Sequence, residues 1–263
     1  MTITDTRQLL SHWNISKALN AALTLASYYR GRIFGSPQHW GKPISLSIEP
    51  TTACNLRCPE CPSGLRSFTR PTGKLSLELL DKTLNEVKDH CTYINFYFQG
   101  EPYLHPQFFE MVKHADNAGI YTATSTNAHF LDDIRAKGTV ESGLDRLIIS
   151  IDGTEQATYE SYRKEGSLAK VIEGTKNVVK WKKELKSKTP HIIFQFLVVK
   201  PNEHQVDEVK KLGKELGVNE VKFKTAQIYD FENGNELIPS IDKYSRYKKG
   251  SAGKWEIKNP LDD

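Results

Sequence analysis

The sequence contains few cysteines, four in 263 residues, and no long apolar run. No stretch reaches the roughly 18 apolar residues that a membrane-spanning helix needs, so no membrane span is expected. The opening residues, MTITDTRQLL, lack a basic start followed by an apolar core and therefore do not form a secretory signal. Three cysteines are clustered and the fourth is distant, which does not suggest a disulfide framework. We expect a cytoplasmic protein whose clustered cysteines bind metal.

A strong excess of charge of one sign is also missing. The net charge of +4 is too small to indicate nucleic-acid binding, and none is expected. No glycine-rich dinucleotide fingerprint follows any expected strand, which argues against a Rossmann-type site. The densest basic run is KWKKELKSK, residues 180–188. We favour a solvated helix face for this run over a docking patch for an acidic partner.

The middle of the chain alternates between strand and helix patterns. The expected strands cover residues 44–49, 92–98, 120–125, 145–151, 191–199 and 218–228. The expected helices between them cover residues 76–90, 107–119, 131–142, 168–186 and 203–217. Such alternation implies a parallel sheet with right-handed crossovers. The fold class is therefore α/β, as a partial (β/α)6 TIM-like barrel or as an open doubly wound sheet.

Three parts of the chain differ in pattern. Residues 1–40 form an expected N-terminal helical extension, residues 41–228 the core barrel, and residues 229–263 an irregular C-terminal tail. Within the extension, residues 18–29 indicate an amphipathic helix, for which we favour packing against the main domain over lying on a membrane surface. The polar tail has few apolar residues, so it is expected to leave the open side of the barrel uncovered.

Polar residues follow several of the expected strands at the point where each strand ends. The cysteine loop follows the first strand, GEP (100–102) the second, STN (125–127) the third and SIDG (150–153) the fourth. In a parallel barrel the carboxyl ends of the strands share one rim, where function gathers. Each segment alone could be a turn. Glu101, between Gly and Pro, either caps a helix start, the default, or receives a cationic group.

The segment CNLRCPEC, residues 54–61, holds the three clustered cysteines in a C-x3-C-x2-C spacing. A structural zinc site requires four protein ligands. Cys91 or His105 could supply the fourth ligand, but Cys91 is expected to pack as a small buried residue. A cubane iron–sulfur cluster has four irons, so three cysteines would leave one iron open for chemistry.

With Cys54, Cys58 and Cys61 after the first strand, GEP after the second and SIDG after the fourth, the chain resembles the radical S-adenosylmethionine (SAM) superfamily over about residues 44–228. The resemblance implies a partial (β/α)6 barrel and a 4Fe–4S cluster whose open iron is chelated by the amino and carboxylate groups of SAM. It also implies a low-potential electron donor, such as flavodoxin or ferredoxin. SAM would be cleaved reductively to a 5′-deoxyadenosyl radical, which abstracts hydrogen from a substrate.

The resemblance also assigns SAM-binding roles. Gly100 and Glu101 resemble the motif that receives the SAM ammonium, a role suited to a carbonyl and a carboxylate. Ser125 and Asn127 match the region known in the family as TNG, near the cofactor.

Further along the chain, Ser150 and Asp152 resemble the polar residues that hold the ribose or the methionyl end. Arg163 resembles an arginine that pairs with the SAM carboxylate; the alternative is a surface helix arginine.

Three positions depart from the family pattern. Gln99 replaces the usual glycine before GEP, Ala128 replaces the glycine of TNG, and Glu60 stands where an aromatic residue is common. None of these changes removes a ligand. Ala128 matters if its backbone requires a positive φ.

The segments IEPTTACNLRCPECPSG and SIDG…YRKEG most resemble the SPASM-type subgroup, whose members modify ribosomally made peptides or mature other proteins. No cysteine follows Cys91 in the sequence, so the cysteine-rich extension of that subgroup is not represented, and we expect either a truncated version or a member that works without auxiliary clusters. A peptide or protein is therefore the first expected substrate and a small cofactor precursor the second. The alternative from another class is a non-enzymatic zinc or iron–sulfur binding module.

Overall fold

The protein is described by a computed structural model that covers residues 2–250 and 253–259. Six parallel strands form one sheet in the order of the sequence, β1 to β6. The strands are β1 (Ser45–Ser47), β2 (Tyr93–Asn95), β3 (Tyr121–Thr126), β4 (Arg146–Ser150), β5 (His191–Val198) and β6 (Glu220–Thr225). This order confirms the partial (β/α)6 TIM-like barrel, because a doubly wound sheet would reverse its strand order part of the way along.

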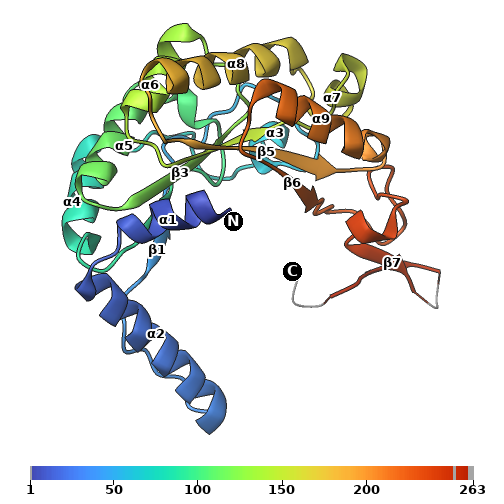
Figure 1. Cartoon of the computed structure of the whole chain (residues 1–263). Coiled ribbons are helices and arrows are strands. Elements are labelled where there is room, and N and C mark those ends of the chain that lie inside the picture. Colours follow the sequence, from blue (N-terminus) through green and yellow to red (C-terminus); the bar gives the residue numbers. More distant parts are fainter. Residues whose placement is uncertain (1, 251–252, 260–263) are drawn as a thin grey trace.

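The helices α4, α5, α6, α8 and α9 lie along the outer face of the curved sheet (Figure 1). The α-helices of the described residues are α1 (Ile3–Ser11), α2 (Ile15–Phe34), α3 (Pro62–Leu65), α4 (Leu77–Val87), α5 (Phe108–Asn117), α6 (Asp133–Glu141), α7 (Gln156–Tyr162), α8 (Leu168–Glu184) and α9 (Val206–Leu216). Short 3-10 helices cover Pro102–Leu104, Glu203–Gln205 and Asp242–Tyr244. Helices α3 and α7 were not predicted from the sequence.

Strand β5 illustrates how the core is built. Phe194, Phe196 and Val198 are fully buried, whereas Gln195 and Leu197, which alternate with them, are only partly buried. Successive strand residues point to opposite faces, so the first set packs against the helices and the second faces the inner side of the barrel. Gln195 therefore lies on the inner face of the barrel.

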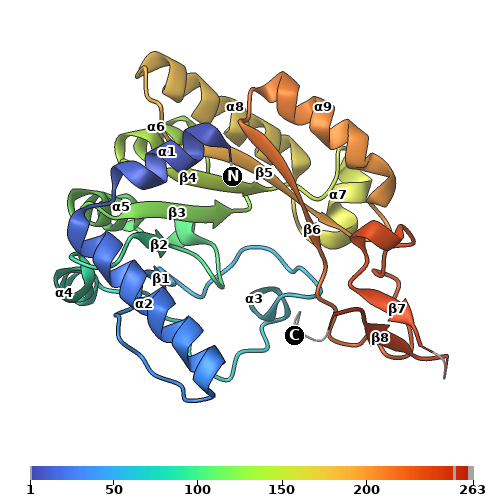
Figure 2. The same ribbon diagram turned by 60° about the horizontal axis from the view of Figure 1, so that its bottom comes forward.

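The C-terminal tail contains one short hairpin within mostly irregular chain, which corrects the expectation of a wholly irregular tail. Strands β7 (Tyr247–Lys249) and β8 (Trp255–Ile257) form an antiparallel hairpin beyond β6 (Figure 2). Leu237, Ile238 and Tyr247 of the tail are buried in one apolar cluster with Leu56 and Cys58 of the cysteine loop. The tail therefore packs against the cysteine loop. The large apolar residues of the tail stand among many polar and turn residues, so the average composition of the tail concealed them.

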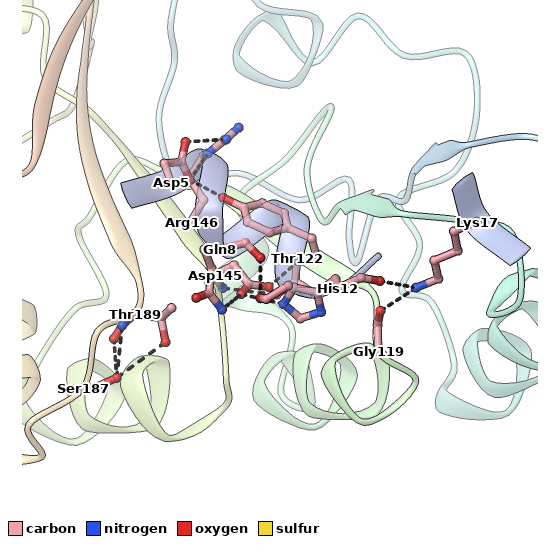
Figure 3. Close-up of polar contacts among 12 residues, drawn as sticks. Asp5, Gln8, His12, Lys17, Gly119, Thr122, Asp145, Arg146, Ser187 and Thr189 are labelled. Carbon is pink, nitrogen blue, oxygen red and sulfur yellow. Dashed lines mark hydrogen bonds and ion pairs between the residues drawn. The ribbon is translucent and has the colours of Figure 1, made fainter. Parts of the chain in front are cut away.

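Helix α1 closes the amino end of the barrel, opposite the predicted site. Asp5 accepts hydrogen bonds from the Tyr121 hydroxyl at 2.5 Å and from Arg146 Nη2 at 2.6 Å, and both residues begin strands (Figure 3). Gln8 Nε2 donates to Asp145 Oδ1 at 2.8 Å. A polar network thus fixes the extension to the start of the sheet.

Helix α2 projects away from the sheet (Figure 1). Its buried residues are Lys17, Asn20, Ala21 and Ser27, whereas most of its large apolar side chains are exposed. The favoured expectation, that this helix packs against the main domain, therefore holds only for its polar side, and the apolar side does not take part. Among the residues that the structure describes, no helix is long and apolar enough to cross a membrane.

Candidate active site

The three clustered cysteines lie between β1 and α4, at the carboxyl end of the sheet. Cys54 and Cys61 are partly buried and Cys58 is buried. One cavity is lined by all three cysteines and by six of the seven residues predicted to bind SAM. These six residues are Gly100, Glu101, Ser125, Asn127, Ser150 and Arg163. Residues separated by more than 100 positions in the sequence thus share one cavity wall, because parallel strands end on the same rim.

The separation of the three sulfur atoms is unlike that of a mononuclear zinc site. One zinc ion binds each sulfur at about 2.3 Å, which places tetrahedral ligands about 3.8 Å apart. In this structure at least two of the three cysteine sulfur atoms lie more than 4.8 Å apart. A four-iron cluster binds each thiolate to a different iron and spaces the sulfurs more widely. The donor set therefore fits a cluster better than a single ion.

Neither candidate fourth ligand is in a position to complete a zinc site. Cys91 is fully buried just before β2, at the amino end of the sheet, and its thiol contacts the Tyr93 carbonyl oxygen. His105 has one ring nitrogen 2.9 Å from the Leu75 carbonyl oxygen, and the other accepts from the Gln107 amide. The prediction that Cys91 is a buried packing residue is confirmed.

Burial controls the chemistry of the thiols. It raises the pKa of Cys54 to about 11 and also raises the pKa of Cys58, although the nearby charge of Arg163 opposes the latter shift. Burial therefore favours the protonated form of the Cys54 and Cys58 thiols. Metal binding replaces these protons, because cysteine binds metal as the thiolate.

Glu101 joins the ends of two strands. Its carboxylate accepts hydrogen bonds from the Tyr103 amide at 3.2 Å, the Thr126 hydroxyl at 2.7 Å and the Asn127 amide at 2.8 Å. The contact to Tyr103 caps a 3-10 helix, which confirms the capping prediction. Burial raises the pKa of Glu101 to about 7. The carboxylate also lines the cavity, so a role toward SAM stays a prediction.

Gly100 holds the GEP segment against the chain that leads into the cysteine loop. Its φ is +79°, and a Cβ atom there would lie 2.2 Å from the Thr51 carbonyl oxygen. The next amide, of Glu101, donates to the Ala53 carbonyl oxygen at 2.7 Å. Only glycine allows this close approach, which fixes the rim of β2 beside Cys54.

Arg163 is directed into the site and is not a surface arginine. Its Nε donates to Asp152 Oδ2 at 2.5 Å, and its Nη1 lies 3.7 Å from Cys58 Sγ. Asp152 is fully buried and also accepts from the Leu197 amide at 2.6 Å. Asp152 is the one predicted SAM residue that does not line the cavity. Its place behind Arg163 suits a role in orienting that guanidinium.

Three further contacts at the site were not predicted from the sequence. Gln99 Oε1 lies 3.5 Å from Cys61 Sγ and accepts from the Ser63 hydroxyl at 3.0 Å. Asn127 Nδ2 donates to Asn55 Oδ1 at 2.8 Å. The sequence signals were Gln99, which departs from the family glycine, and Asn127, which was predicted near the cofactor but without this partner. Such contacts depend on side-chain directions that a strand pattern does not contain.

Comparison with known proteins gives a family and a fold. Residues 48–212 match the model of the radical SAM superfamily. A tungsten-containing aldehyde ferredoxin oxidoreductase cofactor-modifying protein of Pyrococcus furiosus is 29% identical over 73% of this chain and 54% of its own length. A PqqA peptide cyclase of Bradyrhizobium diazoefficiens is 25% identical over 77% of this chain and 52% of its own length. The chain thus spans about half the length of these curated relatives.

Among solved structures, Streptococcus suis SuiB bound to S-adenosylmethionine superimposes with a TM-score of 0.64 at 14% sequence identity. The match covers 85% of this chain and 48% of SuiB. At this identity the likeness establishes the fold alone.

Proposed function

This chain belongs to the radical SAM superfamily, and on that premise we propose that it cleaves SAM reductively and abstracts hydrogen from a substrate. The observation that carries the proposal is the single cavity that joins the three cysteines to six predicted SAM residues. The family uses a 4Fe–4S cluster and SAM, and the donor set of this chain fits both. When bound, this pair supplies a 5′-deoxyadenosyl radical that removes a hydrogen atom from the substrate.

Different residues of the chain would bind the cluster and SAM. Cys54, Cys58 and Cys61 would hold the cluster and leave its fourth iron for SAM. The carbonyl of Gly100 and the carboxylate of Glu101 would accept the SAM ammonium, a charge-assisted contact.

Arg163 would bind the same methionyl end of SAM, whose ammonium and carboxylate groups are attached to one carbon. Its guanidinium would pair with the SAM carboxylate, and the buried contact to Asp152 holds it in direction. Ser125, Asn127 and Ser150 offer hydroxyl and amide groups along the remaining wall. No acid or base is required for bond cleavage, so the task of these residues is positioning and the exclusion of water.

For the substrate we propose a peptide or protein, by analogy with the PqqA peptide cyclase, whose name specifies a peptide. The second candidate is a small cofactor precursor, which the name of the Pyrococcus relative favours. A low-potential donor such as flavodoxin or ferredoxin would supply the electron. The domain division, with the barrel at residues 41–228, belongs to the same proposal.

Metal analysis tests the cluster. The protein is reconstituted anaerobically with iron and sulfide, and about four of each should bind per chain. Cys58→Ala should lose most of this iron, whereas Cys91→Ala, a buried cysteine outside the cavity, should retain it. One zinc per chain without sulfide would instead favour the non-enzymatic binding module.

A further inference from the structure

The N-terminal helix α2 has its apolar side turned away from the rest of the protein. The exposed large apolar residues of this helix, which we call the α2 apolar face, are Ile15, Leu19, Leu23, Leu25, Tyr28, Tyr29, Ile33 and Phe34. Most of them recur at spacings of three, four or seven residues and so gather on one side of the helix. The helix projects beyond the sheet in Figure 1, and its 20 residues span about 30 Å.

The polar side of α2 is already occupied by the protein itself. Asn20 Oδ1 accepts from the Lys42 amide at 2.7 Å, and Asn20 Nδ2 donates to the Lys42 carbonyl oxygen at 3.0 Å. Gly41 runs so close to the helix that a Cβ atom there would lie 2.0 Å from Thr24 Oγ1. The segment that returns to β1 therefore covers this side.

The base of α2 is fixed in the same orientation. Lys17 is almost fully buried, and its Nζ donates to the carbonyl oxygens of Gly119 at 2.5 Å and of His12 at 3.1 Å (Figure 3). Turning the apolar face inward would break these bonds and leave a buried cation without partners. The outward orientation of the apolar face is thus built into the fold.

The sequence around the helix carries charge of a single sign. Between Asp5 and Glu49 the sequence has no acidic residue. The same stretch holds these basic residues: Arg7, Lys17, Arg30, Arg32 and Lys42. Near the far end of α2, Arg30 stacks on Phe34 and Trp40, and its buried Nη1 has no hydrogen-bond partner among the described residues. Arg32 lies over the ring of Tyr28.

We propose that α2 lies on an anionic phospholipid surface, with its apolar face inserted at the boundary between headgroups and acyl chains. An exposed apolar helix face, aromatic residues and cations in a sequence stretch without acidic residues are the features of helices that bind such surfaces in the plane of the membrane. A second copy of the same helix packed in parallel is a poorer partner, because it would bring the same two arginines, Arg30 and Arg32, to the far end. On a lipid surface these two arginines meet phosphates instead.

Vesicle sedimentation with the full chain tests the proposal. We expect the protein to sediment with phosphatidylglycerol vesicles, to stay in solution with phosphatidylcholine vesicles, and to be released from the former by high salt. Leu19→Asp combined with Ile33→Asp should reduce the vesicle partition coefficient by roughly tenfold or more. The fold should be unaffected, since both side chains are mostly exposed, at 61% and 74%.

The matched control is Leu79→Asp combined with Ile134→Asp. It makes the same two changes on α4 and α6, where the side chains are 54% and 83% exposed, and should bind like the unaltered protein. Equal loss of binding in both double variants would overturn the proposal, as would an unaltered chain that does not bind phosphatidylglycerol vesicles.

Size-exclusion chromatography adds a third outcome. A dimer that dissociates only in the α2 variant, without vesicle binding, would overturn the lipid assignment in favour of a second copy.

Discussion

Glu101 shows how one residue serves both the scaffold and the cavity. Its carboxylate accepts three hydrogen bonds from the protein, and it is nearly fully buried at the cavity wall. A glutamine in its place would direct an N–H₂ group, itself a donor, toward groups that donate hydrogen bonds to Glu101. The same substitution therefore tests the capping role through stability and the ligand role through SAM affinity.

We expect Glu101→Gln to lower the free energy of unfolding by about 1–3 kcal/mol, because buried donors lose their acceptor. SAM binding to the cluster-loaded protein should weaken as well, which isothermal titration calorimetry can measure. Glu173→Gln, at an exposed position on α8, is the control and should change neither quantity. A lower melting temperature with an unchanged SAM dissociation constant would leave Glu101 with the capping role alone.

Ala128 adopts the left-handed backbone that the family glycine would favour, with a φ of 62°. This conformation costs an L-residue about 1–2 kcal/mol. Replacing it with glycine removes that cost but also removes a buried methyl group, about 0.8 kcal/mol, and adds chain entropy of about 0.5–1 kcal/mol. The opposing effects are similar in size.

Ala128→Gly should therefore leave the melting temperature nearly unchanged. Ala136→Gly is the matched comparison, since Ala136 is equally buried but lies within helix α6. There the lost helix propensity and the lost methyl group add, so we expect a loss of about 2 kcal/mol. Equal losses at the two positions, measured by urea unfolding, would show that Ala128 is not strained.

Among the structural elements, the strands and the flanking helices were predictable because their patterns are local and periodic. The strand at residues 191–199, for example, corresponds to β5 at His191–Val198. The short helices α3 and α7 were not predictable, since each has too few residues to show a helical period.

The site was predictable in part. The three cysteines and the rim residues carry a family spacing, so they could be named from the sequence. The contact of Gln99 with Cys61 and the place of Asp152 behind Arg163 depend on tertiary packing. No local pattern encodes these directions.

The contact between His12, which follows helix α1, and Asp145 predicts that the stability of the protein depends on pH. The hydrogen bond between His12 and Asp145, 3.1 Å long, raises the pKa of His12 although burial opposes the shift, and the charge of Asp116 adds to the increase. A raised pKa means that the protonated form is stabilised in the folded state. This contribution is complete below the unfolded value of about 6.5 and is lost as the pH rises through the folded value.

His12→Gln should therefore flatten the decline of the melting temperature above about pH 6.5. Thermal unfolding at several pH values between neutral and mildly alkaline measures the effect. His114→Gln removes a histidine from a half-exposed pair with Asp81 and should keep the decline of the unaltered protein. A decline that persists in His12→Gln would assign the dependence to other groups.

At the scale of the whole molecule, the barrel is closed differently at its two ends. Helix α1 covers the amino end, and the tail hairpin packs beside the cysteine loop at the other. Tyr247 links the tail to the barrel, because its hydroxyl bonds the amide and carbonyl groups of Ile228 and its ring stacks on Phe231 at 4.6 Å.

Tyr247→Ala should destabilise the protein by about 3–5 kcal/mol, the usual effect of truncating a buried aromatic residue. Since Leu56 and Cys58 belong to the same apolar cluster, the variant should also lose iron faster to a chelator. Tyr229→Ala, an exposed tyrosine of the same tail, is the control and should behave like the unaltered protein. Iron release at the same rate in both variants would show that the tail does not support the cysteine loop.

The production of 5′-deoxyadenosine from SAM tests the central claim most directly. The reconstituted protein, reduced under anaerobic conditions, should form 5′-deoxyadenosine and methionine even without substrate. Cys91→Ala should do the same, and Cys58→Ala should form neither product. Undiminished formation by Cys58→Ala would contradict the assignment of the cluster ligands, and no formation by the fully loaded protein would contradict SAM cleavage itself.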